Sequence, residues 1–434
     1  MYLDESVAND FITSSHQVGD LAFGYKTVSD VNISQAKGIS DEAARIVSKF
    51  EGRELVLDGL QEISVKSAEA ISKFKGFLSL NGLTSINKPV AEKIAKHKYH
   101  RKKLTRFYEP GEADLYLNGI EDVSPDIAAI LAQHGGKRIH LRGLKTLSKE
   151  AAEFLINSGI YVDLDVEYLS CEVARVLINS KLLNLSRLNQ LDVETANELA
   201  FYKEGMTIGI TNLPVEVAAA LSNHKGRGLH FPNITKITKD SAIAISAYRK
   251  ELRINNLTEI DLEVAKIVTQ CNWPMFFDNL KEIEADVAEC LASTKKNRQV
   301  ISLKGVNHVD HATAAALARF KGNLWLSGLT ELTDAAAEAL SKHQGYLLLD
   351  GVTELSDAAA KALSGHQGGD LNLSGLNQIT DCAAEALSKH QGRLFLNDQT
   401  ELSYFAAEAL SKHSGHICCE APADWVSKRI KSED

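Results

Sequence analysis

One pattern recurs about every 23 residues along nearly the whole chain. Its clearest mark is a pair of apolar residues separated by one position, as in Leu347 and Leu349. The second residue of each pair, the anchor, recurs at intervals of 21 to 26, apart from one interval of 37. The sixteen anchors are Ile33, Leu57, Leu80, Leu117, Leu141, Leu164, Leu185, Ile210, Phe231, Ile254, Phe277, Leu303, Leu326, Leu349, Leu373 and Leu396. A period of this length predicts a solenoid, because one unit cannot bury its apolar face alone.

Each unit changes its apolar period from 2 to 3.6, as the segment Tyr346–Gly368 shows. Leu347 and Leu349 alternate as in a short strand whose apolar side chains face a core. Ser356 and Asp357 then fit a helix start, because serine caps free N–H groups and aspartate suits the positive helix end. The residues that follow share one face of this helix: Ala359, Leu363 and His366. A succession of strand, turn, helix and turn predicts a parallel sheet with right-handed crossovers.

A glycine, asparagine or aspartate stands two positions after most of the anchors. These positions are Gly59, Gly82, Gly119, Gly143, Gly305, Gly328, Gly351 and Gly375, with Asn212, Asn233, Asn256, Asn279 and Asp398 in other units. The three residue types tolerate left-handed backbone angles better than others do. The pattern therefore predicts a positive φ, or an equivalent tight turn, where each strand ends.

The string Ala-Ala-Glu-Ala-Leu-Ser-Lys-His occurs three times, at 336–343, 383–390 and 406–413. A catalytic role is disfavoured, because Ser341 and His343 lie two positions apart on a helix and diverge by about 200°. A shared zinc site is also disfavoured, because neighbouring helices lie about 10 Å apart. Sister units carry Phe50, Phe74 and Phe320 where this histidine stands. We therefore interpret the repeated histidines as packing residues: His97, His134, His224, His343, His366, His390 and His413.

The segments LSLNGLTSI (78–86), LYLNGIEDV (115–123) and LWLSGLTEL (324–332) resemble the leucine-rich-repeat family. The resemblance covers residues 31–415, and the alanine-rich helices look most like bacterial members. It implies an α/β fold, a right-handed horseshoe or arc of about 16 units. Its parallel sheet would form the concave face, and short helices the convex face. We expect residues 1–30 and 416–434 to cap the ends, and a basic insertion to occupy about 98–113.

The inner sheet of such a solenoid is its usual binding surface, and strand residues between the core leucines face it. Large apolar groups stand there where polar ones would be tolerated. They are Phe276, Trp325, Tyr346, Leu348 and Phe395. Contiguous exposed aromatic residues predict a protein or peptide contact. Cover by the C-terminal segment or by a second subunit is the alternative.

Two groups of basic residues could bind an anion instead. Arg138, His140 and Arg142 share one expected strand, and the next strand carries Asp163 and Asp165. They form either an internal ladder of opposite charges or a site for an acidic ligand. In the insertion, basic residues that include Lys102, Lys103 and Arg106 are interleaved with aromatic ones. This segment, 98–108, is either a structural or protein-contact loop or a binder of nucleic acid or another polyanion.

Composition narrows the classes of function. The formal net charge of −9 disfavours broad nucleic-acid binding. No apolar run of 18 residues, N-terminal signal or nucleotide, zinc-protease or serine-hydrolase motif is visible, so we expect a cytoplasmic protein with no membrane, cofactor or metal site. The cysteines lack paired spacing and fit reduced thiols: Cys171, Cys271, Cys290, Cys382, Cys418 and Cys419. The sequence thus predicts a non-enzymatic scaffold for an unidentified protein or peptide, with a polyanion binder as the alternative.

Overall fold

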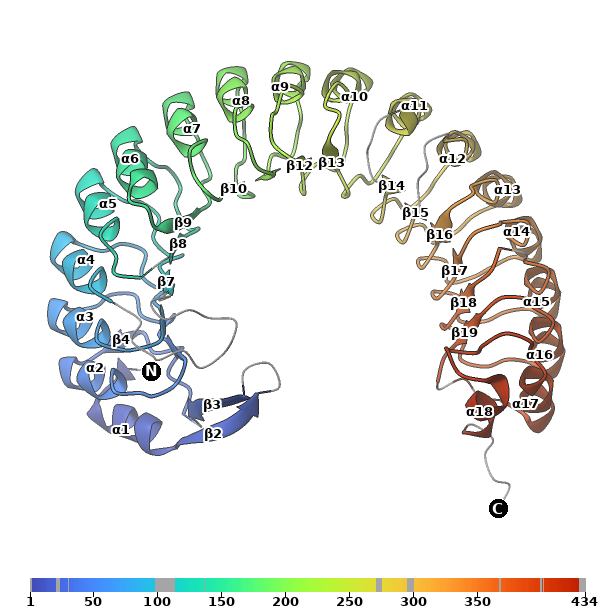
Figure 1. The fold of residues 1–434 in the computed structure, drawn as a ribbon, viewed down its shortest axis with the longest axis horizontal. Helices are drawn as coiled ribbons and strands as arrows, with labels where there is room; N and C mark the ends of the chain where they lie inside the picture. Colours follow the sequence, from blue (N-terminus) through green and yellow to red (C-terminus); the bar gives the residue numbers. More distant parts are fainter. Residues whose placement is uncertain are drawn as a thin grey trace. The chain divides into compact units, whose positions relative to one another are not determined.

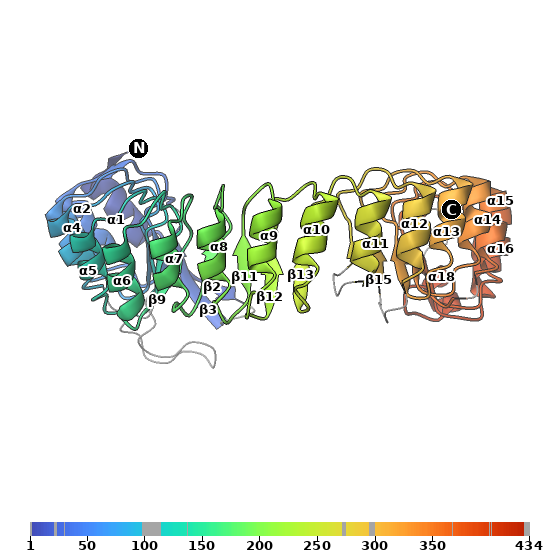
Figure 2. The same cartoon turned by 90° about the horizontal axis from the view of Figure 1, so that it is seen from above.

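The computed structural model describes residues 2–20, 24–29, 31–97, 114–136, 138–270, 275–294, 300–366, 368–398, 400 and 402–428. The chain forms two compact units. Unit 1 comprises residues 1–210 and 224–227, and unit 2 comprises residues 211–223 and 228–434. Within each unit the strands form one layer and the helices another, as Figure 1 shows, and Figure 2 shows the helices standing side by side. This alternation is that of an α/β repeat solenoid.

Unit 1 is built around a five-stranded parallel sheet in the order β5-β6-β7-β8-β9. Its strands are β1 (Tyr2–Leu3), β2 (Ser15–Asp20), β3 (Gly24–Ser29), β4 (Gly38–Ile39), β5 (Glu54–Val56), β6 (Phe77–Ser79), β7 (Asp114–Tyr116), β8 (Arg138–Leu141), β9 (Tyr161–Leu164), β10 (Asn184–Leu185) and β11 (Met206–Ile208). Its helices are α1 (Glu5–Thr13), α2 (Asp41–Val47), α3 (Val65–Ile71), α4 (Lys88–Ile94), α5 (Pro125–Leu131), α6 (Lys149–Asn157), α7 (Cys171–Leu177) and α8 (Val193–Leu199). Strands β10 and β11 form a further parallel pair.

Unit 2 contains a six-stranded parallel sheet in the order β14-β15-β16-β17-β18-β19. Its strands are β12 (Gly228–His230), β13 (Glu251–Arg253), β14 (Met275–Phe276), β15 (Val300–Ser302), β16 (Asn323–Trp325), β17 (Leu347–Leu348), β18 (Leu371–Leu373) and β19 (Leu394–Leu396). Its helices are α9 (Val215–Leu221), α10 (Lys239–Ile245), α11 (Leu262–Gln270), α12 (Ala285–Ala292), α13 (His311–Leu317), α14 (Asp334–Leu340), α15 (Asp357–Leu363), α16 (Asp381–Leu387), α17 (Tyr404–Ser411) and α18 (Pro422–Ser427). Strands β12 and β13 pair in parallel.

The core of each unit lies between the strand layer and the helix layer. All sixteen anchors predicted from the sequence are buried, the most exposed being Ile254 at 6%. The alanines and leucines of the helices face them, as Ala359, Ala360 and Leu363 do on α15. Burying one leucine contributes roughly 1.5–3 kcal/mol. Paired strands lie about 4.8 Å apart and packed helices about 8–10 Å apart, so each unit bends with its strands on the inner side.

The helix starts confirm the predicted caps and add a link between repeats. The hydroxyl of Ser356 accepts a hydrogen bond from the backbone N–H of Ala359 at 3.0 Å, which caps α15. The same hydroxyl donates to the carboxylate of Asp334, the first residue of α14. Equivalent bonds join Thr380 to Asp357, Ser403 to Asp381 and Ser64 to Asp41. We call this series the cap ladder.

The expectation of a positive φ after each strand is wrong at Gly82, Gly119, Gly351, Asn233 and Asn256. The expected tight turn is present, since the backbone N–H of Val352 donates to the carbonyl of Leu349 at 3.2 Å. The glycine is needed for another reason. A Cβ atom on Gly351 would lie 2.0 Å from the backbone oxygen of Ser327 in the preceding repeat. The position therefore allows two backbones to approach closely, and does so with ordinary backbone angles.

Both ends of the repeat array are packed against further elements. Strand β1 pairs in parallel with β4, and the rings of Phe11 and Phe50 lie 4.7 Å apart between centroids. At the other end, Ile417 forms a parallel bridge to Leu394. Trp425 of α18 is fully buried. These contacts place apolar side chains over the outermost repeats.

Candidate partner-binding site

The predicted apolar residues gather on the face of the β14–β19 sheet that points away from the helices, here called the strand face. Phe276, Trp325, Tyr346, Leu348 and Phe395 are all partly exposed, while their strand neighbours are buried. Strand alternation produces this division, because each of these residues except Tyr346 follows an inward-facing apolar residue. The parallel register sets Trp325 directly beside Leu348. We call the five residues the aromatic stripe.

The first part of the stripe is a ring pair that crosses one strand. Phe276 on β14 and Trp325 on β16 are both aligned with Ser302 on the strand between them. Because serine is small, the two rings meet above it, with centroids 6.0 Å apart and planes inclined at 40°. The ammonium group of Lys304 lies 4.9 Å from the Trp325 ring centroid, within the range of a cation–π contact.

The second part of the stripe repeats this arrangement on β17–β19. Tyr346 and Phe395 meet edge to face with centroids 6.3 Å apart, on either side of the strand that carries Asn372. The Asn372 side-chain amide donates to the Tyr346 hydroxyl at 3.2 Å. The guanidinium of Arg393 lies 5.6 Å from the Phe395 ring centroid and is ion-paired with Asp370. Leu348 is aligned with Trp325 on one side and with Asn372 on the other, so it joins the first ring pair to the strand that the second pair crosses.

Two polar atoms beside the stripe are buried without a hydrogen-bond partner among the described residues. They are the indole Nε1 of Trp325 and the Oδ1 of Asp350. A buried unsatisfied polar atom costs about 1–3 kcal/mol, more when it is charged.

On the corresponding face of the β5–β9 sheet in unit 1, charged side chains gather beside Tyr116. The Asp163 carboxylate accepts hydrogen bonds from His140 Nδ1 at 2.8 Å and from Arg142 Nε at 2.7 Å. The guanidinium of Arg138 lies 3.7 Å from the Asp114 carboxylate, and the His140 ring stacks on Tyr116 with centroids 4.2 Å apart. Arg138, His140 and Arg142, which were predicted either to bind an anion or to form an internal charge ladder, thus each lie beside an acid of a neighbouring strand. This arrangement is the one that an internal ladder requires.

This ladder shifts the protonation of its members. Burial lowers the pKa of His140, but hydrogen bonds and charges from Asp114 and Asp163 outweigh it and raise that pKa above the usual value. Burial raises the pKa of Asp163, yet the hydrogen bonds from His140 and Arg142 hold it below its usual range. At Asp165 the effect of burial outweighs the hydrogen bonds that Ser186 and Arg187 donate to the carboxylate, so the pKa of Asp165 is raised. The other predicted bases, Lys102, Lys103 and Arg106, lie outside the described residues.

The repeated histidines pack as the sequence predicted. In unit 2 they form a stack in which His343, His366, His390 and His413 are each at most 5% exposed. Successive ring centroids are 6.1, 5.7 and 6.3 Å apart. In unit 1 Phe50, Phe74, His97 and His134 stack in the same way. The histidine of the repeated octapeptide is therefore a packing residue. Within the described residues, no group of three or more His, Cys, Asp or Glu side chains could hold a metal ion.

The features above define an α/β repeat solenoid of leucine-rich units with an aromatic stripe on one strand face. No family model matches the sequence, and no curated protein matches it. None of the helices in the described part of the chain combines the length and apolar character needed to cross a bilayer.

Several solved structures are similar to this chain. One, from the Toll–Spatzle complex of Drosophila, matches 80% of this chain and 53% of its own, at 13% identity and a TM-score of 0.43. An internalin from Listeria monocytogenes matches 96% of this chain and 95% of its own, at 14% identity and a TM-score of 0.33. A chain of the yeast Rad7 and Elc1 complex matches 83% and 89%, at 11% identity and 0.33. This chain thus spans about half of the chain matched in the Toll–Spatzle structure, and the functions of these proteins do not transfer to it.

Proposed function

We propose that this protein is a non-enzymatic interaction scaffold that binds a protein or peptide segment on the aromatic stripe of unit 2. The observation that carries the proposal is the pair of ring contacts, Phe276 with Trp325 and Tyr346 with Phe395, flanking Leu348 on an exposed sheet face. Phe276, Trp325 and Phe395 each lie between two buried core residues. A polar residue at these outward-facing positions would be compatible with the same fold. Folding therefore does not require them.

The stripe has the size and composition of a binding hot spot. It crosses the six strands from β14 to β19, a span of about 24 Å at about 4.8 Å per strand step. Aromatic residues in such clusters commonly contribute 2 kcal/mol or more each to binding, about the largest contributions at protein interfaces. The C-terminal segment described up to residue 428 leaves all five stripe residues partly exposed. A partner thus has direct access to them.

The test is the double substitution Trp325→Ser and Phe395→Ser in the full chain. Because neither side chain is in the core, we expect the melting temperature to change little. The variant should bind any protein that the wild-type chain captures from an extract of its native cells at least about tenfold more weakly. This factor corresponds to about 1.4 kcal/mol of binding free energy. A purified captured partner then gives the affinity directly, by titration against both chains.

A matched control exists on the helix side of the same unit. Tyr404 and Phe405 are 65% and 67% exposed, and their double change to serine removes two rings without touching the strand face. This control should retain the captured proteins. Equal capture by the stripe variant, or a large fall in its melting temperature, would contradict the proposal. A wild-type dimer that the stripe variant converts to monomer would identify a second copy as the occupant.

A further inference from the structure

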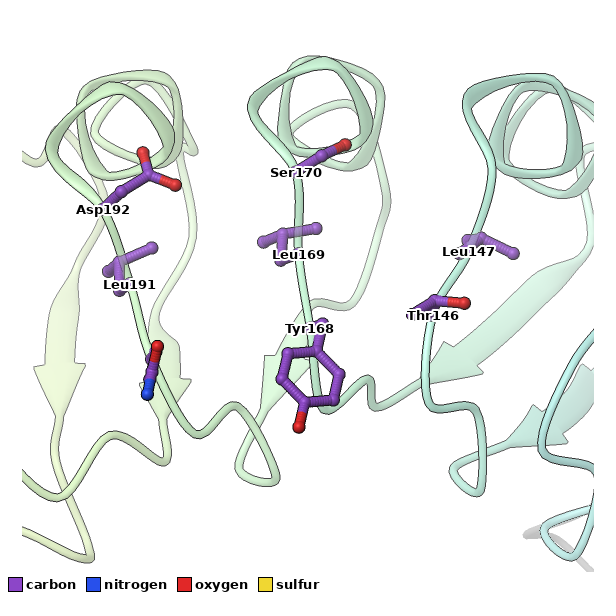
Figure 3. A pocket seen from close by; sticks show the side chains of 8 residues that line it. Thr146, Leu147, Tyr168, Leu169, Ser170, Leu191 and Asp192 are labelled. Carbon is purple, nitrogen blue, oxygen red and sulfur yellow. The ribbon is translucent and has the colours of Figure 1, made fainter.

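Unit 1 contains a hollow of about 460 Å³ on the side where the strands lead into the helices. It lies across three consecutive connections, which supply Thr146 with Leu147, Tyr168 with Leu169, and Gln190 with Leu191. Figure 3 shows Tyr168 in the middle, with Leu147 on one side and Leu191 on the other. The hollow belongs to unit 1, whereas the aromatic stripe belongs to unit 2, so the hollow has no part in the function proposed above.

The middle connection differs from its neighbours in length and in one residue. Between β9 and α7 the chain has six residues, 165–170, whereas the connections on either side, 142–148 and 186–192, have seven. The shorter connection lacks the glycine turn position present at Gly143. It also carries Tyr168 where the neighbours carry Thr146 and Gln190, and this tyrosine is 56% exposed. An exposed aromatic ring thus stands beside the hollow formed around the short connection.

The interior of the hollow suits an apolar side chain. Leu147 and Leu191 are 7% and 9% exposed and present apolar surface. Two of the polar lining groups are already engaged, and one of them is Ser170, which caps α7 through the N–H of Val173 at 3.3 Å. The Asp192 carboxylate caps α8 through the N–H of Thr195 at 2.7 Å. A ligand would therefore meet leucine side chains and the Tyr168 ring, together with the exposed polar side chains of Thr146 and Gln190.

Three glutamates follow the lining residues of the hollow closely in the sequence. Glu150, Glu172 and Glu194 occupy the second position of α6, α7 and α8, directly after the connections that line it. All three are exposed, and within the described residues none of them forms an ion pair. The nearby bases are each paired with another acid: Lys145 with Glu121, Lys149 with Glu153, and Arg187 with Glu167. Three exposed glutamates thus stand close in sequence to the hollow, whose lining contains one more acid, Asp192, and no basic side chain.

We propose that this hollow binds a basic peptide segment, which places one aromatic or large apolar side chain against Tyr168 and its lysine or arginine neighbours beside the three glutamates. Charge complementarity selects this partner over an acidic or neutral one. None of the residues that line the hollow belongs to the aromatic stripe.

The experiment measures the anisotropy of a fluorescent peptide with one phenylalanine flanked on each side by two lysines, titrated with the full chain. We expect saturable binding that weakens as salt is added, because exposed charges are screened. Tyr168→Ser should weaken the affinity about tenfold or more. The triple change Glu150→Gln, Glu172→Gln and Glu194→Gln should weaken it and remove most of the salt dependence. Both variants alter exposed side chains, and thermal unfolding verifies that they remain folded.

Two controls make the outcome decisive. Glu216 and Asp240 hold the same helix position in α9 and α10, and their change to Gln and Asn should leave the affinity unchanged. A peptide with glutamates in place of the lysines should not bind. The proposal is overturned if the lysine peptide does not saturate, if Tyr168→Ser leaves its affinity unchanged, or if an uncharged phenylalanine peptide binds equally well. Sedimentation of the wild-type chain shows whether two copies pair through the hollow. If such pairing prevents the peptide from binding, the proposal is also overturned.

Discussion

The imidazole rings of His366 and His390 stack in the interior of unit 2 with their centroids 5.7 Å apart. Both nitrogens of His366 lack a hydrogen-bond partner among the described residues. Burial, followed by the charges that His390 and His343 would carry, lowers the pKa of His366 to about 4. Burial also lowers the pKa values of His343 and His390. His343, His366 and His390 are therefore neutral rings at neutral pH.

Acid should destabilise unit 2 through this stack. A histidine of the unfolded chain takes up a proton near pH 6.5, whereas folded His366 does so only near pH 4, so the unfolded state binds more protons between these values. Stability should fall as pH drops through this window, by roughly 3 kcal/mol for His366, and level off below it. Urea unfolding at several pH values measures the slope. The variant His366→Phe, which imitates Phe320 in a sister unit, should lose part of it, and an unchanged slope would contradict this account.

Alanine at the strand-end glycine should be costly although its backbone angles are ordinary. The Cβ of Gly351→Ala would press on the backbone oxygen of Ser327, so we expect a loss of about 1–3 kcal/mol in the free energy of unfolding. Gly365 lies in the same repeat, and its Cβ would meet only the oxygen of Ala362, at 3.3 Å. Gly365→Ala should change stability by less than about 1 kcal/mol. Equal effects of the two changes, measured by urea unfolding, would refute the role assigned to close backbone approach.

Removal of residues 416–434 should expose the last repeat. The deletion takes away Ile417, which pairs with Leu394, and the buried Trp425. The bare strand edge and apolar surface should lower the melting temperature and promote aggregation. Light scattering during a thermal scan detects both effects, and deletion of only 429–434 serves as the control. A truncated chain that stays monomeric with unchanged melting would show that this segment is no cap.

The basic segment at 98–108 yields a separate test of polyanion binding. Lys102, Lys103 and Arg106 can be changed together to serine, and we expect folding to be retained because the segment lies outside the repeat period. If the chain binds a polyanion there, affinity for heparin or single-stranded DNA at low salt should be lost, and the salt slope should flatten. Absence of any such affinity in the wild-type chain would leave the aromatic stripe as the favoured site.

The sequence predicted the repeat and its core because periodicity reports burial directly. The anchors, the strand and helix alternation and the packed histidines all follow from residues that recur at fixed spacing. The backbone angle of Gly82 was mispredicted because glycine serves both left-handed turns and close backbone contacts, and only coordinates show which atom a Cβ would strike. The hollow was missed because it depends on three connections lying side by side. Its signals, the short segment 165–170 and Tyr168, are visible in the sequence but have no meaning until neighbouring repeats are aligned.

The hydrogen bonds of the cap ladder all run in the same direction along the chain. Each link has its acceptor in one repeat and its donor in the next, and the series ends at Ser403, after which α17 begins with Tyr404 instead of aspartate. Each of these hydrogen bonds therefore stabilises two adjacent repeats at once. The unfolding of one repeat is thus coupled to the unfolding of its neighbour. Excision of 357–380 would leave Ser356 joined to Asp381, with its donor still facing Asp334 and the Asp381 acceptor still facing Ser403. Whole repeats can therefore be gained or lost in register, because each repeat of this series carries both a donor and an acceptor.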